Sequence, residues 1–397
     1  MASPEPPSVE STSRAARLWG SSGACWLSGE TDGPPDPQGQ GAAVLADLLA
    51  RELYRWIDVH GPALLGERSA LAGFSRMGPV SCNGTSQLIR CSDGFLSFTL
   101  SRESDFLLLG ACFEADVDID PWEFVRNRCR NREVASIRER AILVGLSCAG
   151  AGEHAGSGEP RTHRISGLGR QPLHPIVVDL TALWAGPLAA NLCGLAGARV
   201  VKVESTTRLD GTRVGSPRFF DLLHGGHDSV TIDFSSSVGI AQLKRLVSVA
   251  DVVLTSARPR AFEQLGIDPL AMMAEYPISA WISISAFGSV QPLRIGYGDD
   301  AAIAGGLIGG TPTAPCYVGD AIADPLTGLA AAVIALDALE SGARVWADLA
   351  LADVARRASA LGPRSPLRGV QEIRMPRARP VLVCASAPGT HNQKWLN

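Results

Sequence analysis

Residues 177–205 read VVDLTALWAGPLAANLCGLAGARVVKVES, a strand, a helix and a second strand in close succession. The apolar run 176–180 predicts the first strand, and the apolar residues 187–195 predict a helix that ends at an Ala-Gly pair. The run 199–204, RVVKVE, predicts the second strand. A helix that connects two strands in this way places them parallel and side by side. The stretch therefore predicts a β-α-β unit.

Strands and helices keep alternating after this unit. We expect strands over 229–234, 251–255 and 280–286, helices over 237–249, 270–275 and 324–340, and a strand-to-helix transition over 344–354. This alternation predicts an α/β fold with a doubly wound, mostly parallel sheet. Sheets of this kind bind ligands beyond the carboxyl ends of their strands.

Composition divides the chain into five segments. We expect a disordered head over 1–40, a smaller α+β domain over 41–150, a linker over 151–174, the α/β domain over 175–355 and a tail over 356–397. The head and the linker are rich in Pro, Gly and Ser, a composition that buries little apolar surface. Within the smaller domain, residues 86–115 read as strands and 121–146 as helical.

Charge and cysteine usage exclude several classes of protein. The chain has 397 residues and a formal net charge of −4, so no basic field attracts nucleic acid or an anionic membrane. No apolar run has the length of a membrane span or the form of a signal peptide. The nine cysteines form no CxxC pair, which argues against a zinc site and for a reducing compartment. We expect a cytoplasmic protein that needs no metal.

Candidate chemistry lies in a group of carboxylates. The chain has no GxGxxG after its first strand and no P-loop, GxSxG or HExxH motif. Asp299, Asp300, Asp320 and Asp324 lie within one short stretch. Asp324 precedes Pro325 and an apolar helix, so a plain N-cap explains it. A helix N-terminus also stabilises a carboxylate anion, and an ionised carboxylate facing a cleft is a possible nucleophile. Both interpretations stay open.

Five segments in order resemble family III CoA-transferases, which include formyl-CoA and carnitine CoA-transferases and α-methylacyl-CoA racemase. The segments are the opening VVDLTALWAGPLAANLCGLAGARVVKVES, then SVTIDF, ADVVLTSARPRAFEQLGID, ISISAFG and GDAIADPLTGLAAAVIALDAL. The resemblance covers about residues 175–355. It implies a Rossmann-like domain of this family, acyl-CoA and a carboxylic acid as substrates, coenzyme A as the group transferred, and an interlocked homodimer.

The resemblance also implies roles for single residues. Asp324 falls on the family's catalytic aspartate, which attacks an acyl-CoA thioester and then carries coenzyme A as an aspartyl thioester. The residues expected to contact coenzyme A are Trp184, Ala185, Pro187, Lys202, Arg258 and Arg260. Packing is the alternative for Trp184, a structural role for Lys202, and a solvated surface position for the two arginines.

Several departures keep other activities open. Residues 224–228 read His-Gly-Gly-His-Asp where the family has a basic Asn-Arg-Gly-Lys-Arg turn, Gln264 replaces an arginine of many members, and Tyr297 replaces the histidine of the racemase branch. Residues 86–146 resemble the smaller domain that follows the catalytic helix in the family, so we expect a rearranged relative. The alternatives are an acyl-CoA racemase or isomerase, with Asp324 as acid and base, and an acyl-CoA-binding subunit without activity.

Overall fold

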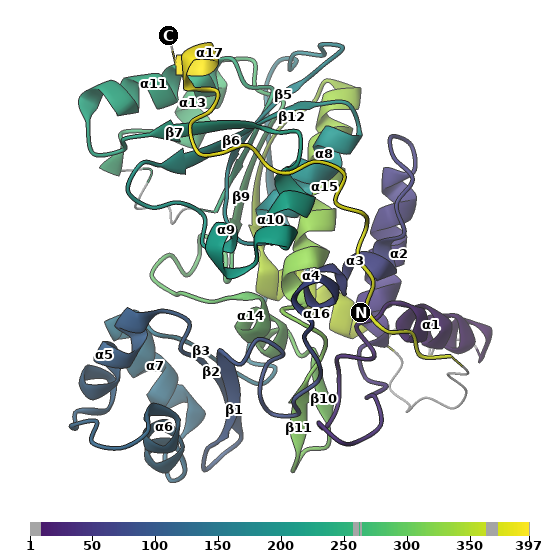
Figure 1. The fold of residues 1–397 in the computed structure, drawn as a ribbon, viewed down its shortest axis with the longest axis vertical. Coiled ribbons are helices and arrows are strands. Elements are labelled where there is room, and N and C mark those ends of the chain that lie inside the picture. The colour runs from purple at the N-terminus through teal and green to yellow at the C-terminus, as the bar shows by residue number, and fades with distance from the viewer. Residues whose placement is uncertain (1–8, 257–261, 263, 363–371, 397) are drawn as a thin grey trace.

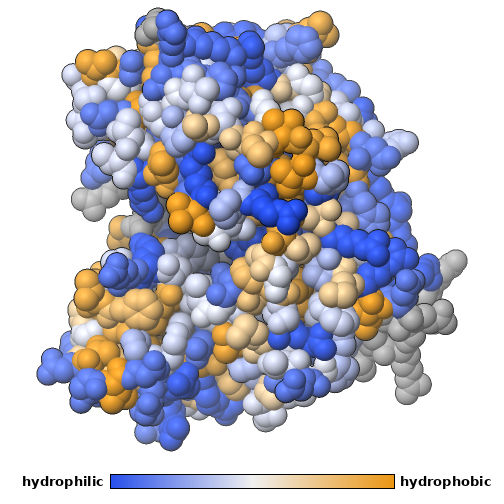
Figure 2. All heavy atoms as spheres, viewed as in Figure 1, coloured by the Kyte–Doolittle hydropathy of each residue, from blue (hydrophilic) through white to orange (hydrophobic). Residues whose placement is uncertain are grey.

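The computed structural model describes residues 9–256, 262, 264–362 and 372–396. Figure 1 shows a larger part built around a central sheet and a smaller part at the lower left. Figure 2 shows that the surface is hollowed between these two parts on the face in view. No helix in the described ranges is both long enough and apolar enough to span a membrane.

A seven-stranded sheet forms the centre of the larger part. In spatial order its strands are β4 (Arg161–Ile165), β12 (Arg344–Ala350), β9 (Ala280–Ser285), β8 (Val252–Thr255), β5 (Ile176–Leu180), β6 (Arg199–Ser205) and β7 (Asp228–Ile232). Neighbouring strands are parallel, except that β4 pairs antiparallel with β12. The order reverses between β5 and β8, which marks the topological switch point where such sheets bind ligands. The prediction of a doubly wound, mostly parallel sheet is confirmed.

Helices cover both faces of this sheet. On one face lie α8 (Ala185–Leu195), α15 (Ala323–Ser341) and α16 (Leu351–Leu361), and α2 (Gln40–Leu53) packs on α15 and α16. On the other face lie α11 (Ser237–Ser248) and α13 (Pro269–Glu275). Strands covered on both sides must be apolar on both sides, which explains the nearly continuous apolar runs in their sequences.

Shorter elements complete the larger part. They are α1 (Val9–Ser21), α3 (Gly61–Leu64), α4 (Glu67–Ala72), α9 (Thr212–Gly215), α10 (Pro217–His224), α14 (Gly298–Ala304), α17 (Asn392–Leu396) and the hairpin of β10 (Ile308–Gly310) with β11 (Pro315–Tyr317). Helices α4 and α14 both lie beside the candidate site.

The smaller part has its own antiparallel sheet and core. It contains β1 (Ser86–Arg90), β2 (Phe95–Thr99), β3 (Ser147–Gly150), α5 (Glu103–Phe113), α6 (Pro121–Cys129) and α7 (Val134–Val144). The expectation that 86–115 holds only strands is wrong for its last third, because α5 is a helix. The apolar run FLLLGACF does not distinguish the two forms by periodicity. In α5, Leu109, Cys112 and Phe113 face the core at helical spacing.

Asp300 of α14 links the two parts. Its buried carboxylate accepts hydrogen bonds from Ser97 and Thr99 of β2 at 2.9 and 2.8 Å and from Ser147 of β3 at 2.6 Å. All three hydroxyls belong to the smaller sheet, so this buried network fixes that sheet against the first turn of α14.

The expectation of disorder over 1–40 is wrong for the described residues of this segment. Trp19 of α1 is fully buried, its Nε1 donates to the carbonyl oxygen of Asp36 at 2.9 Å, and Gly39 lies directly against its ring. Trp19 and a few small apolar neighbours form a local core. The Pro-, Gly- and Ser-rich composition of the segment as a whole does not reveal this core. Helix α2 then packs on α15 and α16, so residues 40–53 belong to the larger part and not to the expected α+β domain.

The expected linker and tail also carry structure. Residues 151–174 include β4, which forms an edge of the main sheet. Residues 372–396 run along the larger part and end in α17 beside β7 (Figure 1). Arg379 fastens this tail, because its guanidinium donates to both carboxylate oxygens of Glu67 at 2.8 and 2.9 Å and to Asn191 at 2.9 Å.

Candidate active site

Asp324 lies where three helices begin. It is in the first turn of α15, and its carboxylate accepts hydrogen bonds from the backbone N–H of Ala185, at the start of α8, and of Gly298, at the start of α14. Helix N-termini carry unpaired N–H groups and a partial positive charge. The three helix starts therefore form a small anion-holding environment around one carboxylate.

Asp324 does not cap its own helix. The N-cap residue of α15 is Ile322, and no side chain makes a capping bond there. The N-cap interpretation is therefore wrong, because the carboxylate is directed toward two neighbouring helices. Since α8 follows β5, which lies at the switch point, this carboxylate lies at the carboxyl-end edge of the sheet.

Gly298 must be a glycine for this arrangement to exist. A Cβ atom at this position would lie 2.1 Å from Oδ2 of Asp324 and 2.6 Å from the carbonyl oxygen of Ala321. Any side chain would displace either the carboxylate or the turn before α15. The close approach of backbone and carboxylate is what permits the N–H contact.

Strained backbone flanks the site on two sides. Leu183 has a φ of 71° and Ala321 a φ of 42°, in the left-handed region that non-glycine residues avoid. The N–H of Ala321 donates to Oδ1 of Asp299 at 3.0 Å, and its carbonyl accepts from the N–H of Asp324 at 2.8 Å. The N–H of Leu183 donates to the carboxylate of Asp210 at 3.2 and 3.3 Å. Strain held by surrounding bonds is characteristic of functional sites.

Two more carboxylates and one arginine lie around Asp324. Asp320 is paired with Arg68 of α4, whose Nε lies 2.9 Å from Oδ2 and whose Nη2 contacts Oδ1. Asp320 also accepts from the Ser69 hydroxyl at 2.7 Å. Asp299 is buried on α14. The cluster thus holds three carboxylates and one guanidinium.

Burial changes the acidity of two of these carboxyl groups. It raises the pKa of Asp324 to about 7, although the positive charge of Arg68 opposes the change. Burial and the negative charge of Asp320 raise the pKa of Asp299 to about 8. At neutral pH, Asp324 is therefore divided between its protonated and ionised forms, which suits a group that must be both a nucleophile and a leaving group.

The loop residues expected to contact coenzyme A are mostly buried. Trp184 is 1% exposed, with Arg68 over its ring at 5.0 Å and Phe219 edge-on at 5.3 Å, so packing accounts for its side chain. Pro187 is buried within α8. Ala185 reaches the site through its backbone N–H and not through a side chain.

Lys202 has the structural role that was the alternative to ligand binding. Its side chain is 1% exposed, and its ammonium group lies 3.1 Å from Asp210 and 3.7 Å from Asp179 and donates to the carbonyl of Thr181. These bonds hold the loop after β5 in place. Arg258 and Arg260 lie outside the described residues.

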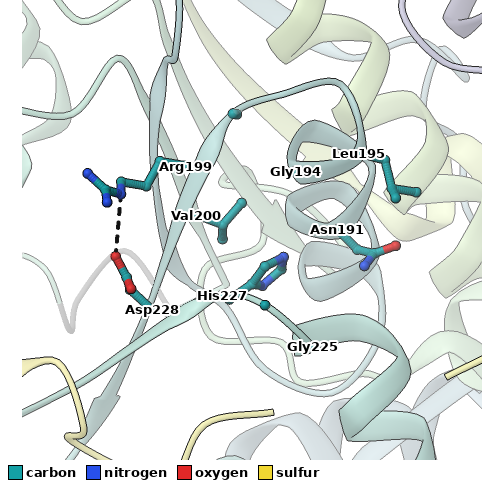
Figure 3. A pocket seen from close by; sticks show the side chains of 10 residues that line it. Asn191, Gly194, Leu195, Arg199, Val200, Gly225, His227 and Asp228 are labelled. Carbon is teal, nitrogen blue, oxygen red and sulfur yellow. Dashed lines mark ion pairs between the residues drawn. The ribbon is translucent and has the colours of Figure 1, made fainter. Parts of the chain in front are cut away.

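The turn that replaces the family's basic turn supplies no free cation. His224 and His227 are buried, and burial lowers the pKa of His227 to about 4 and that of His224 well below its usual value. His227 lines a pocket of about 370 Å³ with Asn191, Arg199 and Asp228 at the amino ends of β6 and β7 (Figure 3). Arg199 is 3.6 Å from Asp228 there. This pocket lies at the opposite edge of the sheet from Asp324.

Arg68 and Gly298 are site residues that the sequence did not indicate. Arg68 comes from a segment outside the family resemblance, and nothing in its neighbouring sequence marks it. Gly298 directly follows Tyr297, and the family resemblance marks only Tyr297, which replaces the racemase histidine. In the described residues, no group of three or more His, Cys, Asp or Glu side chains is arranged to hold a metal ion.

The fold and the site define an α/β protein with a half-buried, titratable carboxylate at the switch point of a doubly wound sheet. Residues 175–359 match the model of CoA-transferase family III. The matched range runs from the start of β5 into α16 and includes Asp324.

Curated relatives carry names of the same kind. The chain is 29% identical over 208 residues to the succinate–glutarate CoA-transferase of Agrobacterium fabrum, covering 47% of this chain and 52% of the relative. It is 34% identical over 187 residues to the succinyl-CoA–D-citramalate CoA-transferase of Chloroflexus aurantiacus, covering 44% and 46%. It is 28% identical over 212 residues to the human succinyl-CoA:glutarate CoA-transferase, covering 49% and 46%. The chain thus spans about half the length of these relatives.

Proposed function

We propose that this protein transfers coenzyme A between carboxylic acids, with Asp324 as the nucleophile. The observation that carries the proposal is the Asp324 carboxylate, which leaves its own helix uncapped and accepts N–H groups from the starts of α8 and α14. A carboxylate that served only as an N-cap would accept N–H groups of its own helix and not those of two neighbouring helices. The names of the relatives support acyl-CoA and a carboxylic acid as the substrates.

The reaction begins with attack on the thioester. A carboxylate oxygen of Asp324 bonds to the acyl carbon, the C–S bond breaks, and coenzyme A leaves as a thiolate. The thiolate then attacks the Asp324 carbonyl carbon of the mixed anhydride and expels the donor carboxylate. Asp324 is left as a thioester of coenzyme A. An acceptor carboxylate reverses these steps and departs as the new acyl-CoA.

The neighbouring N–H groups have a role in each addition. When the thiolate or the acceptor carboxylate adds to the aspartyl carbonyl, negative charge develops on its oxygen. The N–H groups of Ala185 and Gly298, which already donate to this carboxyl group, stabilise that charge without moving. Because these N–H groups are already in place before the reaction, they need no rearrangement to stabilise the transition state.

Mass spectrometry of the intact protein tests this proposal. After exposure to a panel of acyl-CoAs, the wild type should carry an adduct of coenzyme A on the peptide that contains Asp324, and hydroxylamine should remove it. Asp324→Asn should form no adduct. Asp337→Asn is the matched control, because Asp337 is an exposed carboxylate on the same helix. An adduct that persists in Asp324→Asn would refute the proposal.

A binding subunit without activity is the second candidate. It is favoured by the turn at 224–228, where two buried and uncharged histidines replace cations. Under that alternative, acyl-CoA binds equally well to the wild type and to Asp324→Asn, and neither forms an adduct.

Tyr297 in place of histidine argues against the racemase. That enzyme would exchange the α-hydrogen of a 2-methylacyl-CoA for deuterium without an acceptor acid.

We also propose a homodimer in the cytoplasm. The dimer rests on resemblance to the family, and the compartment on the nine cysteines, which are all free thiols and of which eight are buried. Light scattering on a sizing column should give twice the 41.7 kDa of the chain. A mass of one chain would refute the dimer.

A further inference from the structure

Arg68 joins the two segments that hold Asp324. Its side chain is 17% exposed, and its Nε and Nη2 form a paired contact with Asp320, four residues before Asp324. Its guanidinium also lies over the ring of Trp184, at 5.0 Å from the centroid. Trp184 directly precedes Ala185, whose N–H donates to Asp324. One side chain therefore bridges the turn before α15 and the start of α8.

The contact with Asp320 fixes the guanidinium in a planar, two-bond geometry. Paired arginine–carboxylate bonds of this kind are directional as well as strong. Asp320 is held a second time by the hydroxyl of Ser69, the next residue of α4. The positive charge held in this way also acts on Asp324, where it opposes the rise in the pKa of that carboxyl group.

The charges around Asp324 make this cation important. The groups that face it and its neighbours are the carboxyls of Asp299 and Asp320, the thiol of Cys82 and the guanidinium of Arg68. Three of these four groups are neutral or negative. Each added negative charge opposes ionisation of Asp324 and the approach of an anionic acceptor acid. Among these groups, Arg68 alone opposes that effect.

We infer that Arg68 is the positioning residue that favours the ionised form of Asp324 and aims its carboxylate at the thioester. The inference rests on the proposed function and deepens it. It assigns this task to a residue from α4, a segment outside the range that matches the family model. Arg68 acts through Asp324, Asp320 and Trp184 and need not touch the acyl-CoA.

The test compares Arg68→Met, Arg68→Lys and the wild type across a pH series. The rate of adduct formation at Asp324 should rise with pH in each protein, because only the ionised carboxyl attacks. In Arg68→Met the midpoint should move upward by about one pH unit, and the plateau rate should fall by about 100-fold, as expected for a misplaced reacting group. Affinity for acyl-CoA should change little. Arg68→Lys should restore most of the midpoint but less of the plateau rate, because lysine lacks the two-bond geometry.

Arg76→Met is the matched control. Arg76 also stacks on a tryptophan, at 5.1 Å from the Trp26 ring, but donates to the carbonyls of Trp26, Glu30 and Gly33. This variant should keep the wild-type midpoint and rate. If Arg68→Met also keeps both, the inference is wrong.

Two further measurements keep the test decisive. If Arg68→Met does not fold because Asp320 is left buried and unpaired, Arg68→Met combined with Asp320→Asn removes that charge and is measured instead. If the wild type forms no adduct, the proposed function fails, and the pKa of Asp324 is followed by carbon-13 NMR with Asp324→Asn for assignment. An unchanged pKa in the Arg68 variants would then overturn the inference separately.

Discussion

At the scale of single residues, the acidity of Asp324 is the property that matters. Burial in the cluster favours the neutral acid, while Arg68 and the two N–H groups favour the anion. Burial prevails, and the pKa rises to about 7. A weakly acidic carboxyl group of this kind is a better nucleophile than an ordinary aspartate once it is ionised. The cost is that part of the protein is protonated at neutral pH.

This balance predicts a pH dependence for the chemical step. Because the ionised form attacks, the single-turnover rate of adduct formation should rise about tenfold between pH 5 and pH 6, reach half of its maximum near pH 7 and level off above about pH 8. A quenched-flow series from pH 5 to pH 9 measures it. A rate that is already flat at pH 5 would show that the attacking group has an ordinary carboxyl pKa.

Gly298→Ala should damage the site without unfolding the protein. The added Cβ would lie 2.1 Å from Oδ2 of Asp324, so the carboxylate must move and lose the N–H of residue 298. We expect a loss of about 100-fold in adduct rate. Gly215→Ala is the control, because a Cβ there meets no atom within 4 Å. Equal rates for the two variants would contradict the role given to Gly298.

At the scale of elements, the turn at 224–228 introduces a pH-sensitive contribution to stability. Burial lowers the pKa of His227 to about 4 from an ordinary value of 6.5. Below pH 6.5 the unfolded chain binds a proton there that the folded protein does not, so folding becomes less favourable as pH falls. The raised pKa values of Asp299 and Asp324 act in the opposite direction, because those groups bind extra protons when folded. A variant without a titrating group at residue 227 separates the contribution of His227 from that of Asp299 and Asp324.

The substitution His227→Leu should therefore make the unfolding free energy depend less steeply on pH below pH 6.5. Between pH 6.5 and pH 4, the wild type should lose about 3 kcal/mol more unfolding free energy than the variant, from the depressed pKa of His227. Urea titrations at half-unit pH steps measure the difference. Parallel curves for the two proteins would show that residue 227 is solvated and titrates normally.

The elements that could be predicted are those whose patterns are local. The unit formed by β5, α8 and β6 is fully specified by apolar runs and an Ala-Gly stop, and it was expected within a residue or two. Helix α5 was missed because its eight-residue apolar run has no clear period. The family motif singled out Asp324 as the candidate nucleophile, which stays a prediction. Ala185 was expected at the site, but its N–H contact with Asp324 and the presence of Gly298 and Arg68 could not be predicted, since these residues approach Asp324 only when three separate segments have packed.

At the scale of the whole molecule, the tail secures the larger part by a buried ion pair. Glu67 is 1% exposed, and Arg379 satisfies both of its oxygens. Glu67 also directly precedes Arg68 on α4. The tail therefore supports the same short helix that supplies the cation near Asp324, which connects the end of the chain to the site.

Arg379→Met should destabilise the protein by about 3 kcal/mol, because it leaves a buried carboxylate without its partner. Arg374→Met is the control, since Arg374 forms an exposed pair with Glu372 at 3.3 Å and such pairs contribute little. Thermal unfolding followed by circular dichroism compares them. Equal melting temperatures for the two variants would mean that the tail does not hold α4.

The bonds between Asp300 and the hydroxyls of Ser97, Thr99 and Ser147 have a consequence for ancestry. They dock the smaller sheet onto α14 whatever the order in which the two are encoded. A gene could therefore encode the smaller module either before or after the α/β domain, and Asp324 would keep its surroundings. Such a circular permutation would leave its trace in the order of segments and not in the architecture.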